Sequence, residues 1–167
     1  MSRVITMMNT SNDVVILTPA LRTAGNIVTG TDAQTETMLQ LGLLNVFPKL
    51  LRHPKANIVK VSWFFNFYLK ANKEAAWTLS NITAGTVNQI DRVLEMDLMG
   101  EVINVLSHGE FKAKKEATWA VTNLTSGGKP HQMKAIIDLG VLEPLARMLT
   151  CNDIKIVQVY KVCNFIN

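Results

Sequence analysis

Apolar and polar residues follow one another along the chain with the period of a helix, and one segment shows this most clearly. In residues 74–85 the apolar positions fall within about 40° of one another on a helical wheel, which predicts an amphipathic helix. The stripe that is expected to be buried consists of Ala75, Leu79 and Ile82. The opposite side carries Glu74, Trp77 and Asn81. A tryptophan and a carboxamide therefore lie one turn apart, away from the core.

The same pattern returns 42 residues later, in residues 116–127. Its apolar stripe consists of Ala117, Val121 and Leu124. Its other side carries Glu116, Trp119 and Asn123. An earlier copy spans residues 18–30 and has Arg22 at the tryptophan position and Asn26 at the asparagine position. The long helix is thus present in three copies.

Two shorter helices are expected between successive copies. A glutamine follows each copy, and a glycine or aspartate comes eight residues after it. These pairs are Gln34 and Gly42, Gln89 and Asp97, and Gln132 and Gly140. Three helices per unit and a period of about 42 residues are typical of an armadillo- or HEAT-type solenoid, so the fold is predicted to be all-α. Gly30, Gly85 and Gly127, which follow the long helices, fit C-cap positions.

The spacing between the first two copies is too long. Asn26 and Asn81 are 55 residues apart, and a block of 13 residues, 61–73, accounts for the excess. It holds five of the eleven aromatic residues of the chain. The block is either a functional insertion, such as a partner-binding hydrophobic loop or membrane wedge, or a retained intron, since Val-Ser can be encoded by a splice-donor sequence. We favour the intron, and interpret the tail at residues 159–167 in the same way.

The block is expected either to loop out or to replace the first turn of the helix that carries Trp77. If the helix ran continuously through 13 extra residues, its two ends would be rotated by about 220° relative to each other. The Trp77 face would then lose its alignment with the other copies.

Composition and charge narrow the range of functions. Hydrophobic residues make up 48% and charged residues 18% of the 167 residues, which is typical of a folded domain. The net charge of +4 is mild, and the densest basic run, residues 112–115, is interpreted as a solvated helix start. Cys151 and Cys163 form neither a disulfide framework nor a metal-ligand spacing. Because no catalytic arrangement and no membrane-length apolar stretch is visible, we expect no enzyme activity, cofactor, metal, direct nucleic-acid contact or membrane contact.

Three segments resemble consecutive armadillo repeats of the importin-alpha (karyopherin-alpha) family: TPALRTAGNIVTG, KEAAWTLSNITAG and KKEATWAVTNLTSGG. The run at residues 153–158 resembles the start of the following repeat. The likeness covers roughly residues 14–60 and 73–159. It is greatest to the C-terminal half of that family's array, which forms its minor site for nuclear localisation signals. It implies a right-handed superhelical solenoid and an adaptor, found in cytoplasm and nucleus, that carries Lys/Arg-rich cargo peptides into the nucleus.

The resemblance also implies a concave groove lined by the long helices. Trp77 and Trp119 would form slots for the alkyl stems of cargo Lys or Arg. The backbone of the extended peptide would be held by Asn26, Asn81 and Asn123. Cargo cations would meet the carboxylates of Glu74 and Glu116. The other expected lining residues are Arg22, Val28, Thr29 and Ser80.

The chemistry of the residues fits these roles independently. An indole face attracts a cation, and a carboxamide can both donate to and accept from a peptide backbone. The competing interpretation is that the tryptophans are only packing residues of the solenoid. A groove for basic peptides should also be locally acidic, so its glutamates must outweigh the neighbouring Lys73 and Lys115.

The expected organisation assigns each range of the chain to a repeat or an irregular segment. Residues 1–17 end a partial repeat, and residues 18–60 form the repeat with the first Asn helix. Residues 61–73 are the aromatic insertion, which we interpret as a non-native loop. The next repeat is residues 74–114, residues 115–158 form a further repeat with the start of another, and residues 159–167 are an aberrant tail. Full-length family members also bind importin-beta and an export factor, through regions expected to be missing from this sequence. The alternatives are another armadillo scaffold for protein–protein interaction, or a non-functional truncated product of an incorrect gene prediction.

Overall fold

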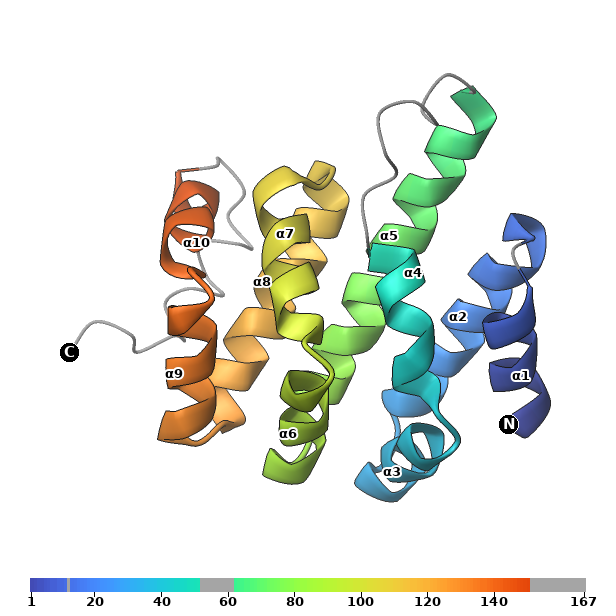
Figure 1. The fold of residues 1–167 in the computed structure, drawn as a ribbon, viewed down its shortest axis with the longest axis horizontal. Coiled ribbons are helices and arrows are strands. Elements are labelled where there is room, and N and C mark those ends of the chain that lie inside the picture. The colour runs from blue at the N-terminus through green and yellow to red at the C-terminus, as the bar shows by residue number, and fades with distance from the viewer. Residues whose placement is uncertain (12, 52–61, 151–167) are drawn as a thin grey trace.

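The computed structural model describes residues 1–11, 13–51 and 62–150. This part of the chain consists of helices and the turns between them (Figure 1). In chain order they are α1 (Ser2–Thr10), α2 (Val14–Val28), α3 (Asp32–Gln40), the 3-10 helix η1 (Leu43–Val46), α4 (Phe47–Leu51), α5 (Ser62–Thr83), α6 (Val87–Glu95), α7 (Leu98–His108), α8 (Phe111–Gly127), α9 (Pro130–Asp138) and α10 (Leu142–Leu149). The predictions for residues 153–158, for the tail at 159–167 and for both cysteines fall outside the described residues.

The long helices α2, α5 and α8 lie side by side in one layer, with α5 in the middle (Figure 1). Helices α4, α7 and α10 form a second row, and α3, α6 and α9 lie along one edge of the stack. Each element packs mainly on its own repeat and on the next one, as in a solenoid. The predicted all-α armadillo-type architecture is confirmed. None of the helices in the described ranges is long and apolar enough to span a membrane.

The predicted apolar stripes of α5 and α8 form the centre of the core. All six of their residues are fully buried: Ala75, Leu79, Ile82, Ala117, Val121 and Leu124. They belong to one cluster of buried residues that continues from α1 to α10. Because burial of a Leu or Ile side chain stabilises a fold by about 1.5–3 kcal/mol, these stripes hold neighbouring repeats together.

The glycines after the long helices do not act as left-handed C-caps, which corrects the prediction made for them. Within the described chain, positive φ angles occur at equivalent positions before the second helix of each repeat: Gly42, Asp97 and Gly140. Gly30 and Gly85 instead leave room for a glutamine side chain. A Cβ atom at these two positions would lie 2.0 Å from Oε1 of Gln34 and 1.9 Å from Oε1 of Gln89. Gly127 is the last residue of α8.

The repeated glutamines cap the short helices, and Gln89 and Gln132 also connect neighbouring repeats. Gln89 Oε1 accepts a hydrogen bond from the backbone N–H of Thr86 at 3.1 Å, as part of a capping box. Its Nε2 donates to the carbonyl of Asp32 in the preceding repeat at 3.1 Å. Gln132 repeats this contact and donates to the carbonyl of Val87 at 2.9 Å. The repeated glutamine therefore has a structural role at one edge of the solenoid.

Residues 62–73 of the block are helical, so the prediction of a loop is wrong. They continue without a break into the rest of α5, and the alternative prediction, that the block replaces the first turn, describes the structure better. Counted back from the tryptophans, Leu69 takes the place in α5 that Phe111, the first residue of α8, takes in its own repeat. The reason is the apolar pattern, because Ala71 then falls at the place of Ala113 and both are buried. The Trp77 face thus keeps its alignment with α8.

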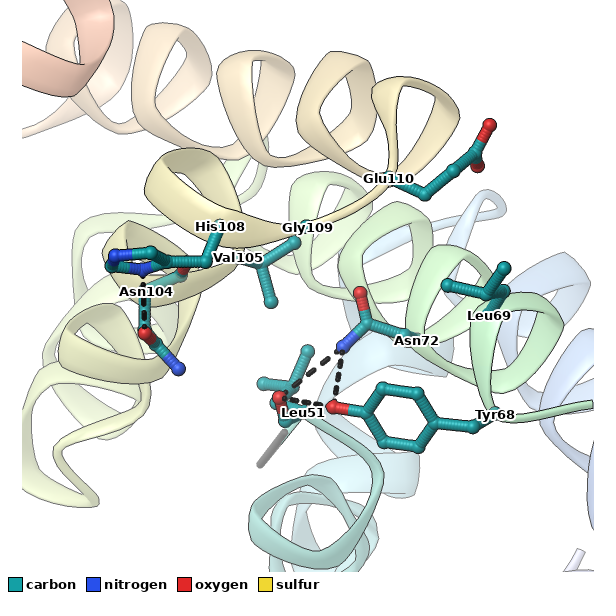
Figure 2. A pocket seen from close by; sticks show the side chains of 9 residues that line it. All are labelled: Leu51, Tyr68, Leu69, Asn72, Asn104, Val105, His108, Gly109 and Glu110. Atoms are coloured by element: carbon teal, nitrogen blue, oxygen red, sulfur yellow. Dashed lines mark hydrogen bonds between the residues drawn. The ribbon is translucent and has the colours of Figure 1, made fainter. Parts of the chain in front are cut away.

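The end of the block also satisfies the carbonyl groups at the end of α4 (Figure 2). Asn72 is buried, and its Nδ2 donates to the carbonyl of Leu51 at 3.2 Å. The hydroxyl of Tyr68 donates to the same carbonyl at 3.1 Å. Helix ends leave backbone carbonyls without intrahelical partners, so these contacts stabilise both α4 and the start of α5.

Candidate functional site

Five of the predicted site residues come together where α2, α5 and α8 pass one another. A shallow pocket of about 340 Å³ lies there. It is lined by Arg22, Asn26, Glu74, Trp77 and Glu116, which were predicted, and by Lys73. Lys73 was expected only as a neighbouring charge, and it is the last residue of the block. Residues from three repeats therefore form one surface hollow.

The two tryptophans differ in their exposure to solvent. Trp119 is 42% exposed, whereas Trp77 is half-buried and packs against Gly25 of the preceding repeat. A Cβ atom at position 25 would lie 2.3 Å from Cζ3 of Trp77. The interpretation of the tryptophans as packing residues therefore holds in part for Trp77, while Trp119 offers the more open indole surface.

The three asparagines of the long helices have different surroundings. Asn123 Nδ2 donates to the carbonyl of Ser80 in the preceding repeat at 2.9 Å. Asn81 is half-buried, and its Nδ2 is buried without a hydrogen-bond partner among the described residues. Asn26 is exposed. A buried donor without a partner costs about 1–3 kcal/mol, so the Nδ2 of Asn81 lowers the stability of the free chain in this conformation.

Glu74 is buried, and cations of the same pocket already hold its carboxylate. Arg22 donates to it from Nη2 and also from Nε, at 3.3 Å, and Lys73 Nζ lies 3.5 Å from Oε1. Burial by itself raises the pKa of Glu74, but the hydrogen bond from Arg22 and the charges of Lys73 and Arg22 outweigh it, so the net pKa is lowered. Glu74 is therefore an ionised and internally neutralised carboxylate.

Glu116 has the opposite environment. It is half-buried, and its carboxylate forms no hydrogen bond or ion pair with another residue in the described part of the chain. Burial raises the pKa of Glu116, the charge of Glu74 raises it further, and Lys73 and Lys115 only partly offset this. Nearby cations therefore compensate the burial of Glu116 less fully than that of Glu74, and an added cation would stabilise its ionised form.

The charges of the pocket balance. Arg22 and Lys73 face Glu74 and Glu116, so the glutamates do not outweigh the cations at this point. A groove for basic peptides was expected to be acidic. The structure differs because the block places Lys73 beside Glu74, and because Arg22 takes the tryptophan position of its repeat.

Two predicted lining residues are buried, and one is exposed. Val28 is 4% exposed and belongs to the core, since it continues the apolar side of α2 to its last residue. Ser80 is also 4% exposed, and its hydroxyl donates to the carbonyl of Trp77 at 2.8 Å. The side chains of Val28 and Ser80 therefore do not line the surface, which corrects the prediction. Thr29 is exposed, with its hydroxyl bonded to the carbonyl of Asn26 at 2.7 Å.

A different hollow, of about 300 Å³, lies between α4, the start of α5 and the end of α7 (Figure 2). Tyr68 and Asn72 point toward the end of α4, and His108 and Asn104 hydrogen-bond to each other on α7. Burial is the main cause that raises the pKa of Tyr68 to about 12. These groups are engaged with each other or with the backbone, so this hollow offers less chemistry than the pocket at Trp77.

Comparisons with known proteins support this description of the fold and its repeats. Residues 86–126 match the armadillo/beta-catenin-like repeat family. Importin subunit alpha-4 of Arabidopsis thaliana is 38% identical over 144 residues, which cover 86% of this chain and 24% of the relative. Importin subunit alpha-3 of the same plant is 40% identical over 157 residues, which cover 94% of this chain and 27% of the relative. Importin subunit alpha-1a of Oryza sativa subsp. japonica is 43% identical over 89 residues, 53% of this chain and 15% of the relative.

Solved structures support the same fold. An engineered protein from the Northeast Structural Genomics Consortium superposes with a TM-score of 0.81 at 26% identity, and the match covers 97% of this chain and 61% of that one. A designed armadillo repeat protein, solved in complex with the peptide (KR)4, has a TM-score of 0.54 at 21% identity, covering 97% and 79%, and supports the fold alone.

The stacked three-helix units, with an asparagine at the equivalent position of each long helix, define an armadillo-repeat solenoid. The chain belongs to the importin-alpha family of these proteins. It spans between 15% and 27% of the length of the curated relatives named above. Proteins of this family and fold are adaptors and scaffolds rather than enzymes.

Proposed function

We propose that this chain binds Lys/Arg-rich nuclear localisation signals of cargo proteins along the exposed side of α2, α5 and α8, as a part of a nuclear import adaptor. The observation that carries the proposal is the repeated pair of an indole and a carboxamide one turn apart, Trp77 with Asn81 and Trp119 with Asn123. The relatives named importin subunit alpha support it. Movement between cytoplasm and nucleus, and binding of importin-beta and an export factor, belong to the whole protein in the same proposal.

Trp119 and Glu116 would together select a cationic side chain. The alkyl stem of a Lys or Arg packs along the exposed indole of Trp119, and a cation over an indole face gains about 0.5–2 kcal/mol. The carboxylate of Glu116 then supplies the charge that the cation needs. The positive charge of the ligand offsets the desolvation that raises the pKa of Glu116, so ionised Glu116 and the ligand cation stabilise each other.

The asparagines would hold the peptide backbone. Asn26 is open to solvent, and Asn81 has an unpartnered Nδ2 that would donate to a peptide carbonyl once its half-buried side chain turns toward the groove. Asn123 is already held by the carbonyl of Ser80, which orients its amide before any ligand arrives. Contacts to the backbone are independent of sequence, so the choice of Lys or Arg is left to the indole and carboxylate groups.

The test is fluorescence-anisotropy titration of a labelled Lys/Arg-rich peptide against the wild-type chain and Trp119→Ala. Leu142→Ala on α10 is the matched control, because Leu142 is 53% exposed and lies outside the groove. We expect Trp119→Ala to weaken binding about threefold to thirtyfold, and Leu142→Ala to leave it unchanged. Equal binding by Trp119→Ala, or preferred binding of an acidic peptide of the same length, would contradict the proposal and favour another kind of armadillo scaffold.

A further inference from the structure

The hollow between α4, the start of α5 and the end of α7 takes no part in the proposed function (Figure 2). Within the described residues it shares no lining residue with the pocket at Trp77. Its apolar lining consists of Leu51, Leu69 and Val105, together with the ring of Tyr68. A concave site with apolar walls and a few polar groups is the usual form of a small-molecule site. We call this hollow, of about 300 Å³, the Tyr68 pocket.

One polar atom in the lining of the Tyr68 pocket has no partner. Asn72 is 3% exposed, and its Nδ2 donates to the carbonyl of Leu51 at 3.2 Å. No donor in the described part of the chain bonds to its Oδ1, which points away from Leu51 (Figure 2). Because a buried acceptor without a donor is costly, a ligand that brings an N–H group to this atom would be stabilised.

The pocket exists because the block at residues 61–73 places a short side chain where the next repeat has a long one. Counted back from the tryptophans, Asn72 takes the place of Lys114. Lys114 Nζ donates to the carbonyl of Ser107 near the end of α7 at 2.9 Å, as Asn72 donates to that of Leu51 at the end of α4. The shorter asparagine makes an equivalent contact and leaves space beside it. The Tyr68 pocket thus follows from a departure of this chain from its own repeat pattern.

The charges around the Tyr68 pocket favour a cation. Helix α7 ends there at His108, and the C-terminal end of a helix carries a partial negative charge. Glu110 adds a full charge, which offsets the partial positive charge at the start of α8. Burial and, to a smaller extent, the charge of Glu101 raise the pKa of Tyr68, so a second carboxylate acts on the pocket. Among the described residues, no Lys or Arg lines it.

We propose that the Tyr68 pocket binds a small organic amine, a primary ammonium group on an apolar body of about the size of a phenyl ring. The ammonium group donates to Oδ1 of Asn72 and is attracted by the carboxylate of Glu110. The ring packs between Leu69 and Val105. A single alkyl stem, such as that of a lysine side chain, would fill less of the space and gain fewer contacts. The inference is independent of the proposed function, because the ligand does not enter the groove.

The test is a titration of the isotope-labelled chain with small molecules, followed by the chemical shifts of its amides. Phenethylamine is the probe. Phenethyl alcohol keeps the ring without the charge, and phenylacetate carries the opposite charge. A lysine with both backbone ends blocked as amides distinguishes a lysine side chain of a partner from a free amine with a ring.

Three variants complete the experiment. Glu110→Gln removes the carboxylate, which forms no side-chain cap on α8. Leu69→Trp fills the pocket, and circular dichroism checks that its helices persist. Glu95→Gln is the matched control, because Glu95 is an exposed carboxylate at the end of α6 and does not line the pocket.

We expect phenethylamine to bind the wild-type chain with a Kd of about 1–10 mM, as its size allows, and to shift the amides of Leu69 and Gly109. Phenethyl alcohol and the blocked lysine should bind about threefold to tenfold more weakly, and phenylacetate more weakly still. Glu110→Gln should weaken binding of phenethylamine about twofold to fivefold and leave phenethyl alcohol unchanged, whereas Glu95→Gln changes neither. Leu69→Trp should abolish binding.

Equal binding of phenethylamine and phenethyl alcohol would mean that the pocket does not select a cation, and overturns the inference. The same holds for amide shifts around Trp119 instead of Leu69, for equal effects of Glu110→Gln and Glu95→Gln, and for no binding of any probe. Blocked lysine that binds as tightly as phenethylamine overturns the assignment to a free amine with a ring. If Leu69→Trp does not fold, the comparison of the two glutamine variants still decides. Each of these outcomes leaves peptide binding in the groove as a separate measurement.

Discussion

The indole of Trp77 lies against Gly25 of the preceding repeat, so closely that a Cβ atom at position 25 would come within 2.3 Å of Cζ3. Gly25 directly precedes Asn26, just as Ser80 precedes Asn81. The residue before each of these asparagines therefore meets the next repeat, since Ser80 is buried and its carbonyl holds Asn123. Trp77 thus both lines the groove and packs two neighbouring repeats together.

Gly25→Ala should lower the stability of the fold and displace the Trp77 ring. Overpacking by one methyl group in a tight contact costs about 1–3 kcal/mol. Urea unfolding gives the free energy, and the shift of tryptophan emission reports the displacement. Gly127→Ala is the control, because a Cβ atom there would meet only the carbonyl of Gly85 at 3.9 Å. Equal stability of the two variants would contradict the close contact at Gly25.

Asn123→Asp should weaken both the fold and peptide binding. The substitution removes the donor that reaches the carbonyl of Ser80 at 2.9 Å and faces that carbonyl with a carboxylate oxygen. The expected loss of unfolding free energy is about 1–3 kcal/mol. Asn26→Asp is the comparison, since Asn26 is exposed and should leave the free energy of unfolding nearly unchanged. If urea unfolding gives the two variants the same free energy of unfolding, the hydrogen bond from Asn123 to the carbonyl of Ser80 does not stabilise the fold.

Glu116→Gln should stabilise the free chain at neutral pH and weaken its binding of a Lys/Arg-rich peptide. The pKa of Glu116 is raised above its ordinary value of 4.5, so its contribution to stability is complete below that value and is lost as the pH rises through the raised pKa. The amide does not ionise and avoids this loss. Urea unfolding between pH 4 and pH 7 should show a gain below about 1 kcal/mol at the upper end.

Glu74→Gln is the control, because it should change the stability at neutral pH in the opposite direction. The pKa of Glu74 is lowered, so its stabilisation is present above 4.5 and is lost as the pH falls through the lowered pKa. The variant should therefore be less stable than wild type at pH 7 and should approach it in acid. If Glu116→Gln lowered the free energy of unfolding at neutral pH, or if Glu74→Gln left it unchanged, the two carboxylates would not have the opposite environments described.

Tyr68→Phe should cost about 0.5–1.5 kcal/mol, because it removes the hydrogen bond to the carbonyl of Leu51 at 3.1 Å. Absorbance titration supplies the second measurement. Burial raises the pKa of Tyr68 to about 12, so the wild-type chain should show a late ionisation step that Tyr68→Phe lacks. Stability should be complete below the ordinary value of 10.0 and fall as the pH rises toward 12. A normal step for Tyr68 would contradict the packing of the block on α4.

The origin of the block stays a prediction. If sequencing finds the codons for residues 61–73 in most transcripts, the intron interpretation is wrong. The position of those residues in the fold no longer decides the question, since they form helix from Ser62 onward and that helix aligns with α8 from Leu69 onward. The block was expected to loop out or to replace the first turn, because 13 extra residues in a continuous helix would misalign the Trp77 face. Ala71 instead continues the buried stripe of α5, and the helix follows that stripe rather than the boundary inferred from the spacing.

The sequence by itself determined the repeat of about 42 residues, the apolar stripes through Leu79 and Val121, and the exposed positions of Trp119 and Asn26. All of these follow from the helical period within one segment, which needs no knowledge of a neighbour. Only the tertiary structure decided what crosses from one repeat to another: the contact of Trp77 with Gly25 and the pairing of Glu74 with Arg22. These contacts join residues about 50 positions apart, and they depend on how closely two helices approach, which the local pattern does not contain.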